Sequence, residues 1–303
     1  MAYAARRLGH ALLVVFLVVT LSFFMVRLTG DPVALLAGAE ASEQQIQAIQ
    51  RALHLDKPGW LQYAIYLQDV LRGDFGHSFF TSLPAMSMVL QTLPNSMVLT
   101  LVAFAAAVVV ALPIGIVSAA RPRSLADWTA RFLSVLGQCT PVFWLGILMM
   151  LLFSVKLRWL PFGGAGTWKH LVMPGLTLAA LMVPVVVQVT RSALLEALRQ
   201  DYVRTARSKG LSEIQVLLKH ALRNASIPVV TVFGLRLGFI VGGAIVTETV
   251  FSYPGLGRLA VQAVNYRDFP VIQALLVIVS TAVVSINLML DWMYALLDPR
   301  VRY

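Results

Sequence analysis

The chain has 303 residues, of which 58% are hydrophobic and only 13% carry charge, and its mean hydropathy is +0.78. Soluble domains usually contain about 25% charged residues, so this composition argues against an ordinary soluble enzyme or binding domain. The formal net charge of +10 does not predict nucleic-acid binding, because membrane proteins concentrate excess lysine and arginine in their cytoplasmic loops. We therefore expect a membrane protein that has no nucleic acid among its partners.

Six apolar segments are long enough to cross a bilayer, since about 20 apolar residues in a helix span ~30 Å of hydrocarbon. The first follows Arg6 and Arg7 and exceeds the apolar core of a signal peptide, with no small-residue cleavage site after it. We interpret it as an uncleaved span. All six are continuous apolar runs, which distinguishes them from alternating barrel strands. The six spans are predicted at about 9–27, 95–119, 132–155, 172–194, 229–250 and 271–296.

The distribution of charge predicts the orientation. Placing the N-terminus in the cytoplasm gives the inner segments the larger share of lysine and arginine, as the positive-inside rule requires, and then both termini are cytoplasmic. The outer segment 28–94 contains two stretches of helical period, 43–55 and 58–71, which we expect to lie as amphipathic helices on the outer face. A second outer loop is predicted at 251–270 and includes Pro254-Gly255-Leu256-Gly257.

The predicted cytoplasmic segment 195–228 is polar and basic, although it lies between two apolar spans. Tyr202, Ala206 and Gly210 are spaced at i, i+4 and i+8, and a second apolar stripe continues after Gly210 through Ile214 and either Leu217 or Leu218. This pattern predicts two short helices joined at Gly210, where a glycine permits a tight turn and close approach of a partner. Periodicity alone leaves two interpretations open: a binding surface for a cytoplasmic partner, or a helix whose basic face lies on anionic lipid.

Motifs for nucleotide binding and catalysis are absent from the sequence. It contains no G-x-x-x-x-G-K-[ST], no H-E-x-x-H and no G-x-S-x-G, and its five histidines include no i,i+4 pair suited to a metal. We expect no catalytic, cofactor or metal site and no enzymatic activity in this chain. The competing class, a secondary transporter or channel, would favour coupling carboxylates deep in several spans, whereas Glu248 and Asp291 lie near span ends.

Among the ionisable residues inside predicted spans, where charge is costly and often functional, we single out Arg236, Glu248 and Asp291. Arg236 and Asp291 lie at similar depths from the inner ends of their spans, counted at ~1.5 Å per residue. They either form a pair or extend separately to the interface. Glu248 either faces a transport path or supports packing near the Tyr253 turn, and we favour packing. Four prolines lie in or near spans, where they can bend helices: Pro113, Pro141, Pro174 and Pro184.

An ordered series of short motifs extends over nearly the whole chain. The series resembles the permease subunits of binding-protein-dependent ABC importers, in the branch that imports dipeptides, oligopeptides and nickel. The resemblance implies an all-α membrane protein of six transmembrane helices with the type I ABC importer permease fold, in a single domain over residues 1–303. The motifs include Gly30-Asp31-Pro32, Gly73-Asp74-Phe75-Gly76, Leu160-Pro161, Asp201-Tyr202-Val203-Arg204, His220-Ala221-Leu222-Arg223, Pro254-Gly255-Leu256-Gly257 and Asp298-Pro299-Arg300.

The segment 201–228 is similar to the cytoplasmic EAA loop of these permeases, which docks a short helix into a cleft on the ATP-hydrolysing subunit. Ala206 and Gly210 agree with the EAA consensus. Arg204 replaces its acidic residue and Thr205 its first alanine, as is typical of the peptide and nickel branch. By this resemblance, the residues that couple the chain to the ATPase are Tyr202, Arg204, Thr205, Ala206, Arg207, Lys209, Gly210, Leu211, Ile214 and Leu217.

The resemblance also implies partners and cargo. The expected partners are a second, homologous permease in a heterodimer, two cytoplasmic ATPase subunits that bind ATP and Mg²⁺, an extracytoplasmic substrate-binding protein, and the lipid of a bacterial inner membrane. Short peptides are the commonest cargo of this branch. Nickel complexes, glutathione and other small solutes are the alternatives.

Overall fold

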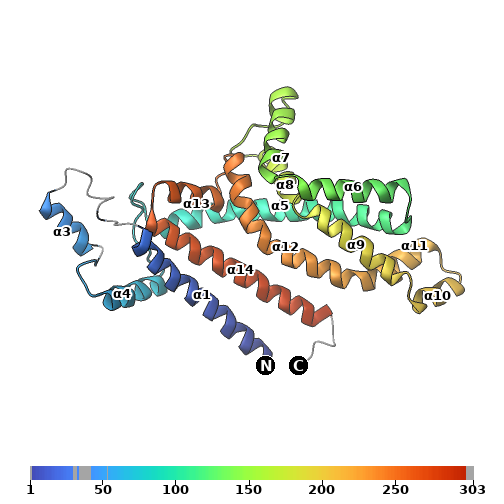
Figure 1. The fold of residues 1–303 in the computed structure, drawn as a ribbon, viewed down its shortest axis with the longest axis horizontal. Coiled ribbons are helices and arrows are strands. Elements are labelled where there is room, and N and C mark those ends of the chain that lie inside the picture. Colours follow the sequence, from blue (N-terminus) through green and yellow to red (C-terminus); the bar gives the residue numbers. More distant parts are fainter. Residues whose placement is uncertain (1, 30–32, 34–41, 53, 298–303) are drawn as a thin grey trace. The chain divides into compact units, whose positions relative to one another are not determined.

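The computed structural model describes residues 2–29, 33, 42–52 and 54–297 (Figure 1). The motifs at 30–32 and 298–300 lie outside the described residues. The described part of the chain is helical, and its one extended pairing is an isolated bridge between His77 and Pro84. Contacts divide the chain into two compact units: residues 1–93 with 259–285, and residues 94–258 with 286–303.

The first unit contains α1 (Ala2–Thr29), α3 (Glu43–Ala52), α4 (Gly59–Arg72), the beginning of α5 (Ala85–Ala120), most of α13 (Leu256–Asn265) and the first half of α14 (Phe269–Leu297). The amphipathic helices predicted at 43–55 and 58–71 are therefore present as α3 and α4. The interval predicted as the loop 251–270 contains the helix α13, which the sequence interpretation missed.

Aromatic packing and shared hydroxyl hydrogen bonds attach α4 to α1. The ring of Phe23 lies 5.1 Å from that of Tyr63 and 5.4 Å from that of Tyr66, measured between centroids. The hydroxyls of Ser22 and Tyr66 are 2.9 Å apart. Burial raises the pKa of the Tyr66 phenol, and the Ser22 hydrogen bond opposes that shift. The phenol therefore stays neutral at physiological pH and can share this hydrogen bond.

The motif that follows α4 is a structural connection. Gly73 ends α4 with φ of +75°, and Gly76 turns the chain again with φ of +77°, conformations that glycine adopts without steric cost. The hydroxyl of Ser78 then donates to the buried carboxylate of Asp268, which also accepts the Phe79 amide at 3.0 Å. These bonds attach the outer segment to the residue that precedes α14.

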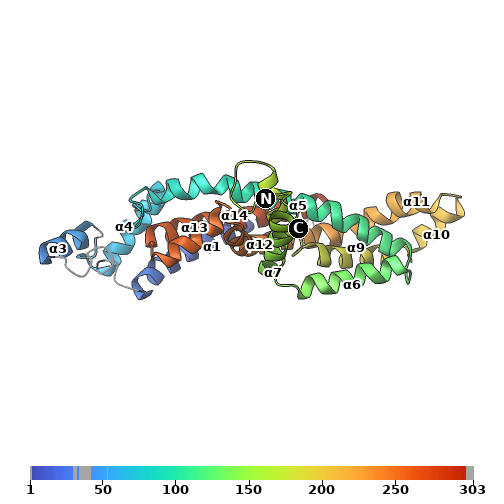
Figure 2. The ribbon, with the colours of Figure 1, turned by 90° about the horizontal axis from the view of Figure 1, so that it is seen from above.

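The second unit contains the remainder of α5 and the helices between it and α13, which follow in chain order: α6 (Leu125–Cys139), α7 (Val142–Met149), the π-helical η1 (Met150–Lys156), α8 (Lys169–Ala179), α9 (Val183–Ala197), α10 (Asp201–Ser208), α11 (Glu213–Gln215), the π-helical η2 (Val216–Ala221) and α12 (Leu222–Val250). Helix α9 contacts both α6 and α12, and the two views show it between them (Figures 1 and 2).

A stripe of small residues on α5 allows this close packing. Ala103, Ala107 and Ala111 are buried at i,i+4 spacing and belong to the same apolar cluster as Met182 and Val186. Small side chains let helix backbones approach one another closely in a membrane. A Cβ placed on Gly115 would lie only 2.7 Å from the Cβ of Thr190, so α5 and α9 are in near backbone contact there.

Two predicted spans are bent helix pairs. The range 132–155 falls on α6, α7 and η1, with a 104° bend at Thr140–Pro141, and 172–194 falls on α8 and α9, with a 54° bend. Proline lacks the amide hydrogen that would continue a helix. Pro141 precedes α7 and Pro184 lies in the first turn of α9, whereas Pro113 and Pro174 lie inside continuous helices.

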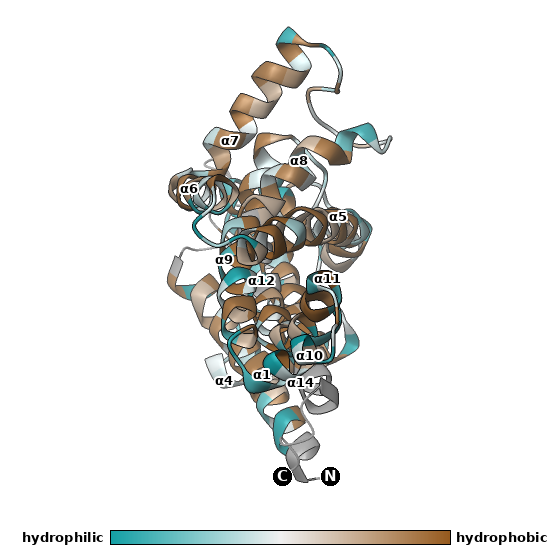
Figure 3. Ribbon diagram, turned by 90° about the vertical axis from the view of Figure 1, so that its right-hand side faces the viewer, coloured by the Kyte–Doolittle hydropathy of each residue, from teal (hydrophilic) through white to brown (hydrophobic). Residues whose placement is uncertain are grey.

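By length and composition, three helices in the described part of the chain could cross a membrane, or five if each bent pair is one span. The three are Arg6–Leu28, Ala85–Ala120 and Phe269–Leu290. The predicted span 229–250 lies in α12, a continuous helix of 29 residues. Six spans and two cytoplasmic termini remain predictions. Figure 3 shows apolar residues predominating along α7, whereas hydrophilic residues gather at α10 and α11.

Candidate functional site: the coupling element

The polar segment between α9 and α12 folds as two short helical stretches around Gly210. We call residues 201–221, comprising α10, α11 and η2, the coupling element. Val203, Ala206 and Val216 are buried against each other, with Leu198 and Leu211 packed beside them. This small apolar cluster folds α10 back against η2, so the coupling element is a compact structure with its own core.

The turn at Gly210 depends on a left-handed backbone conformation. Gly210 has φ of +79°, and its amide donates to the Arg207 carbonyl at 2.9 Å. No atom lies within 4 Å of where its Cβ would be, so space does not require glycine here but backbone conformation does. The next helix begins at Ser212, whose side chain and that of Gln215 form a reciprocal capping box.

An ion pair closes the turn from outside. The Arg207 guanidinium donates from Nε and Nη2 to the two Glu213 carboxylate oxygens at 2.8 and 3.0 Å. The Arg207 hydrogen bond lowers the pKa of Glu213, and the same bond raises the pKa of Arg207. Because the carboxylate pKa is lowered, the pair contributes its full stability to the turn above the ordinary glutamate pKa. That stability is lost as pH falls through the lowered pKa. The pair is therefore formed throughout the neutral range.

The structure separates the predicted coupling residues into two groups. Ala206 is buried and Leu211 is partly buried, and both pack the element itself. Leu217 is partly buried against the apolar cluster that the element shares with α5, α9 and α12. Ala206 was predicted to contact a partner directly, and in this chain its side chain faces inward. The exposed members are Tyr202, Arg204, Thr205, Arg207, Lys209, Gly210 and Ile214.

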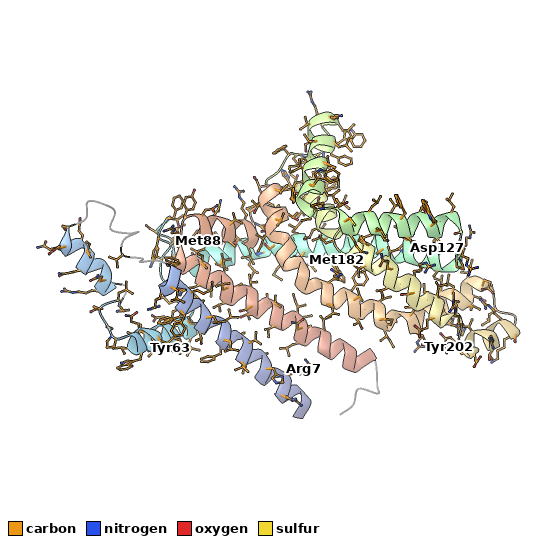
Figure 4. The ribbon with its side chains drawn as sticks, viewed as in Figure 1. Arg7, Tyr63, Met88, Asp127, Met182 and Tyr202 are labelled. Atoms are coloured by element: carbon orange, nitrogen blue, oxygen red, sulfur yellow. The ribbon has the colours of Figure 1, made fainter. Side chains whose placement is uncertain are left out.

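Two exposed apolar side chains are prominent on this polar segment. Ile214 is 70% exposed and Leu218 is 50% exposed, and Tyr202 on α10 is also exposed (Figure 4). The sequence left the choice between Leu217 and Leu218 open, and Leu218 is the exposed one. Exposed aliphatic side chains on a folded polar element are available for contact with a protein partner or with lipid.

Glu248 occupies a buried structural position near the end of α12. Its carboxylate accepts the Ser96 hydroxyl at 2.6 Å and the amides of Gly257 and Arg258 at 2.7 and 3.2 Å. The Ser96 hydroxyl accepts the Leu256 amide at 2.7 Å. Glu248 and Ser96 together thus cap the N-terminus of α13, where amides lack helical partners. This geometry favours the packing role for Glu248.

Close approach to Glu248 also explains the adjacent glycines. A Cβ on Gly255 would overlap the Glu248 carboxylate, and one on Gly257 would overlap the backbone of Ile245. The Pro254-Gly255-Leu256-Gly257 motif is therefore the turn that permits the Glu248 cap to form.

The second predicted intramembrane group involves α12 and α14. A Cβ on Gly234 would overlap the Leu290 side chain, so the two helices meet closely there. Arg236 and Asp291 lie within two residues of this contact in sequence. The Asp291 side chain lies outside the described residues, and its pairing with Arg236 remains a prediction.

A third polar cluster was missed by the sequence interpretation. Asp127 on α6 is completely buried, and Arg191 on α9 donates to its two carboxylate oxygens from Nε at 2.5 Å and from Nη2 at 2.9 Å. Ser118 donates to the same carboxylate at 2.6 Å, and so does the Arg123 amide at 2.9 Å. We call these four residues the Asp127 cluster. The available sequence signal was Ser124-x-x-Asp127, a helix-start pattern.

The first unit contains a cavity of about 620 Å³ in the region of α1, α4 and the turn that follows α4. Arg27, Gln62, Tyr66 and Asp69 are among its lining residues. The Arg27 guanidinium lies 3.5 Å from the centroid of the Phe23 ring. Within the described residues, no group of three or more histidine, cysteine or acidic side chains could hold a metal ion.

The chain is helical, contains several apolar helices of membrane length, and has the type I ABC importer permease fold. Residues 111–303 match the family described as binding-protein-dependent transport system inner membrane component, and residues 1–103 match the model of its N-terminal part. The chain belongs to this family and is the permease subunit of an ABC importer.

Relatives match over the full length. The glutathione transport system permease protein GsiC of Salmonella choleraesuis is 43% identical over 99% of both chains, and GsiC of Escherichia coli K12 is 41% identical over the same share. The dipeptide transport system permease protein DppB of Alkalihalophilus pseudofirmus is 38% identical over 100% of both. The inward-facing MetNI methionine ABC transporter matches in fold, with a TM-score of 0.59 and 20% identity, over 70% of this chain and 97% of that one.

Proposed function

We propose that this permease carries short peptides inward across a bacterial inner membrane, and that separate ATPase subunits drive it through the coupling element. The observation that carries the proposal is the exposed surface of Ile214 and Leu218 on a compact, polar element. The sequence has no phosphate-binding loop of its own, so ATP and Mg²⁺ bind in the partner subunits.

The transport pathway forms between this chain and a second, homologous permease in a heterodimer. An extracytoplasmic binding protein delivers cargo to the outer segments 28–94 and 251–270. When ATP closes the two ATPases, the coupling element of this chain and the corresponding loop of the second permease are drawn together, and the outer side opens. Hydrolysis then returns the pathway to the inward-open state. The chain does not itself catalyse a reaction.

The cargo assignment rests on the full-length relatives, one named for dipeptide transport and others for glutathione transport. Glutathione is itself a small peptide, so both names describe a substrate with amide bonds and charged ends. Dipeptides and oligopeptides are therefore the proposed cargo, and glutathione is the second candidate. Nickel complexes belong to the same branch by resemblance, but neither relative is named for them.

The experiment is uptake by the complete importer in proteoliposomes, using radiolabelled dipeptide and glutathione with and without internal ATP. We expect uptake that requires both ATP and the binding protein, with the unlabelled form of the preferred cargo as competitor. Uptake driven by an ion gradient without ATP would contradict the proposal and favour a secondary transporter. An importer that hydrolyses ATP but transports neither the dipeptide nor glutathione would still be an ABC importer, and the proposed cargo would be wrong.

A further inference from the structure

The Asp127 cluster joins three helices at the end of the second unit that bears the coupling element. Asp127 lies on α6, Ser118 in the last turn of α5, and Arg191 on α9. Helix α9 ends at Ala197, shortly before the coupling element begins at Asp201. Figure 4 labels Asp127 on α6 and Tyr202 on α10.

An apolar cluster beside these groups connects the same helices to the coupling element. Ala119 of α5, Leu194 of α9, Ala221 of η2 and Ala225 of α12 are buried together. Leu198 contacts this cluster and also the internal cluster of the coupling element. A displacement of α10 and η2 is therefore transmitted by apolar contact to α9, α12 and the end of α5, and this cluster contains no residue of α6.

The ion pair has a geometry that apolar contacts lack. The two-pronged Arg191 guanidinium fixes both the rotation and the axial register of α9 against α6, because each of its two donor nitrogens must meet a different oxygen of the Asp127 carboxylate. Apolar contact between helices is non-directional by comparison. Buried ion pairs often contribute little net stability relative to apolar replacements, so the cluster is better explained by positioning than by stabilisation.

The backbone at the cluster supports this interpretation. Arg123 has φ of +63°, a conformation that is uncommon for residues other than glycine. Its amide donates to the Asp127 carboxylate, and the Ser124 hydroxyl accepts the Asp127 amide at 3.2 Å. The carboxylate thus holds the α5–α6 turn in one conformation while it holds Arg191.

We propose that Asp127 and Arg191 are positioning residues that make α5 and α6 move with the coupling element when the ATPases act on it. This role rests on the proposed function: the Asp127 cluster would transmit the movement of the ATPases to the helices that form the transport pathway. Without the pair, the coupling element would still bind the ATPase, but α9 could rotate or slide against α6. ATP would then be hydrolysed with little transport.

The test measures uptake and ATP hydrolysis together in the complete importer in proteoliposomes. For Asp127→Asn and Arg191→Lys we expect assembled complexes that hydrolyse ATP, with cargo transported per ATP reduced about tenfold, within the range seen for residues that link distant sites. Arg131→Gln is the matched control. Arg131 is 3.6 Å from the same carboxylate but its side chain is 51% exposed, so its transport per ATP should stay within about twofold of wild type.

The ratio of transport to hydrolysis distinguishes positioning from a purely structural role. If both activities fall together in proportion to the amount of assembled complex, the proposal is overturned. If Asp127→Asn does not assemble, Ser118→Ala provides a milder change, and wild-type coupling in both Ser118→Ala and Arg191→Lys would also overturn it. A wild-type importer that moves no peptide with ATP contradicts the proposed function instead.

Discussion

At the scale of single residues, Gly210 is the position where backbone conformation limits substitution most clearly. Most non-glycine residues in this left-handed conformation cost roughly 1–2 kcal/mol, whereas aspartate and asparagine tolerate it better. An aspartate at Gly210 therefore acts mainly by placing negative charge at the exposed turn. We expect Gly210→Asp to insert normally in the membrane and to abolish uptake. Membrane abundance by immunoblot and uptake of labelled cargo in cells would measure the two outcomes separately.

Gly210→Asn is the matched control, because asparagine tolerates positive φ far better than most residues and carries no charge. We expect it to retain most of the uptake. Full transport by Gly210→Asp at normal abundance would contradict a role for this turn in coupling the permease to the ATPase.

The sequence predicted two short helices joined at Gly210 but not the direction in which each side chain points. Periodicity placed Tyr202, Ala206 and Gly210 on one face, yet Ala206 is buried while Tyr202 is exposed. The return of η2 against α10 determines that difference, and helical period within one segment does not contain it. Asp127 was missed for a similar reason, since its partner Arg191 is 64 residues away.

At the scale of elements, the Glu248 cap predicts the stability of α13. Glu248→Gln keeps the shape but replaces one carboxylate oxygen with an NH₂ group that cannot accept a hydrogen bond. One of the donors from Ser96, Gly257 or Arg258 then loses its acceptor, at a cost of about 1–3 kcal/mol. We expect a lower melting temperature for the purified subunit and faster proteolysis between residues 251 and 258.

Ser252→Ala is a suitable control, because Ser252 lies in the same turn and its side chain is exposed. If Glu248 faced cargo instead, Glu248→Gln would change the KM for uptake and leave melting and proteolysis as they are in wild type.

Hydropathy predicted where the long helices lie in the sequence, but it did not predict where helices bend. The predicted ranges near 9–27, 95–119 and 271–296 fall within the continuous helices α1, α5 and α14. Pro113 and Pro141 both lie in apolar stretches of sequence, but of these two only Pro141 lies at a bend. The packing of neighbouring helices decides whether a proline interrupts a membrane helix. The sequence predicts a loop where α13 forms, because the glycine-rich turn before the helix dominates that short stretch of sequence.

At the scale of the whole molecule, the ordered motifs led to the correct family because several of them are structural connections that the fold requires. The Gly73–Ser78 turn attaches to Asp268, and the Pro254–Gly257 turn attaches to Glu248. Ser78 and Asp268 are 190 residues apart, and Leu256 of the second turn also donates to Ser96, 160 residues away. The order of the motifs therefore carries fold information that composition lacks. Cargo is different, because the binding protein usually selects it, and relatives named for dipeptide and glutathione share this architecture.

The exposed apolar surface of the coupling element predicts how the importer assembles. Ile214 is 70% exposed and Leu218 is 50% exposed on this polar segment, and fully burying an aliphatic side chain of this size contributes about 1.5–3 kcal/mol. We expect the double variant Ile214→Ser with Leu218→Ser to lower affinity for the ATPase about tenfold or more. Copurification from membranes and titration of purified ATPase against reconstituted permease would measure this loss.

Leu125→Ser provides the matched control, because Leu125 is 78% exposed at the start of α6 and, by the predicted orientation, also faces the cytoplasm. It should leave ATPase affinity unchanged. Both Ile214 and Leu218 lie outside the internal cluster of Val203, Ala206 and Val216, so the double variant should still fold. Equal ATPase binding by the double variant and wild type would mean that this surface instead lies on lipid, the alternative that the basic face of the segment leaves open.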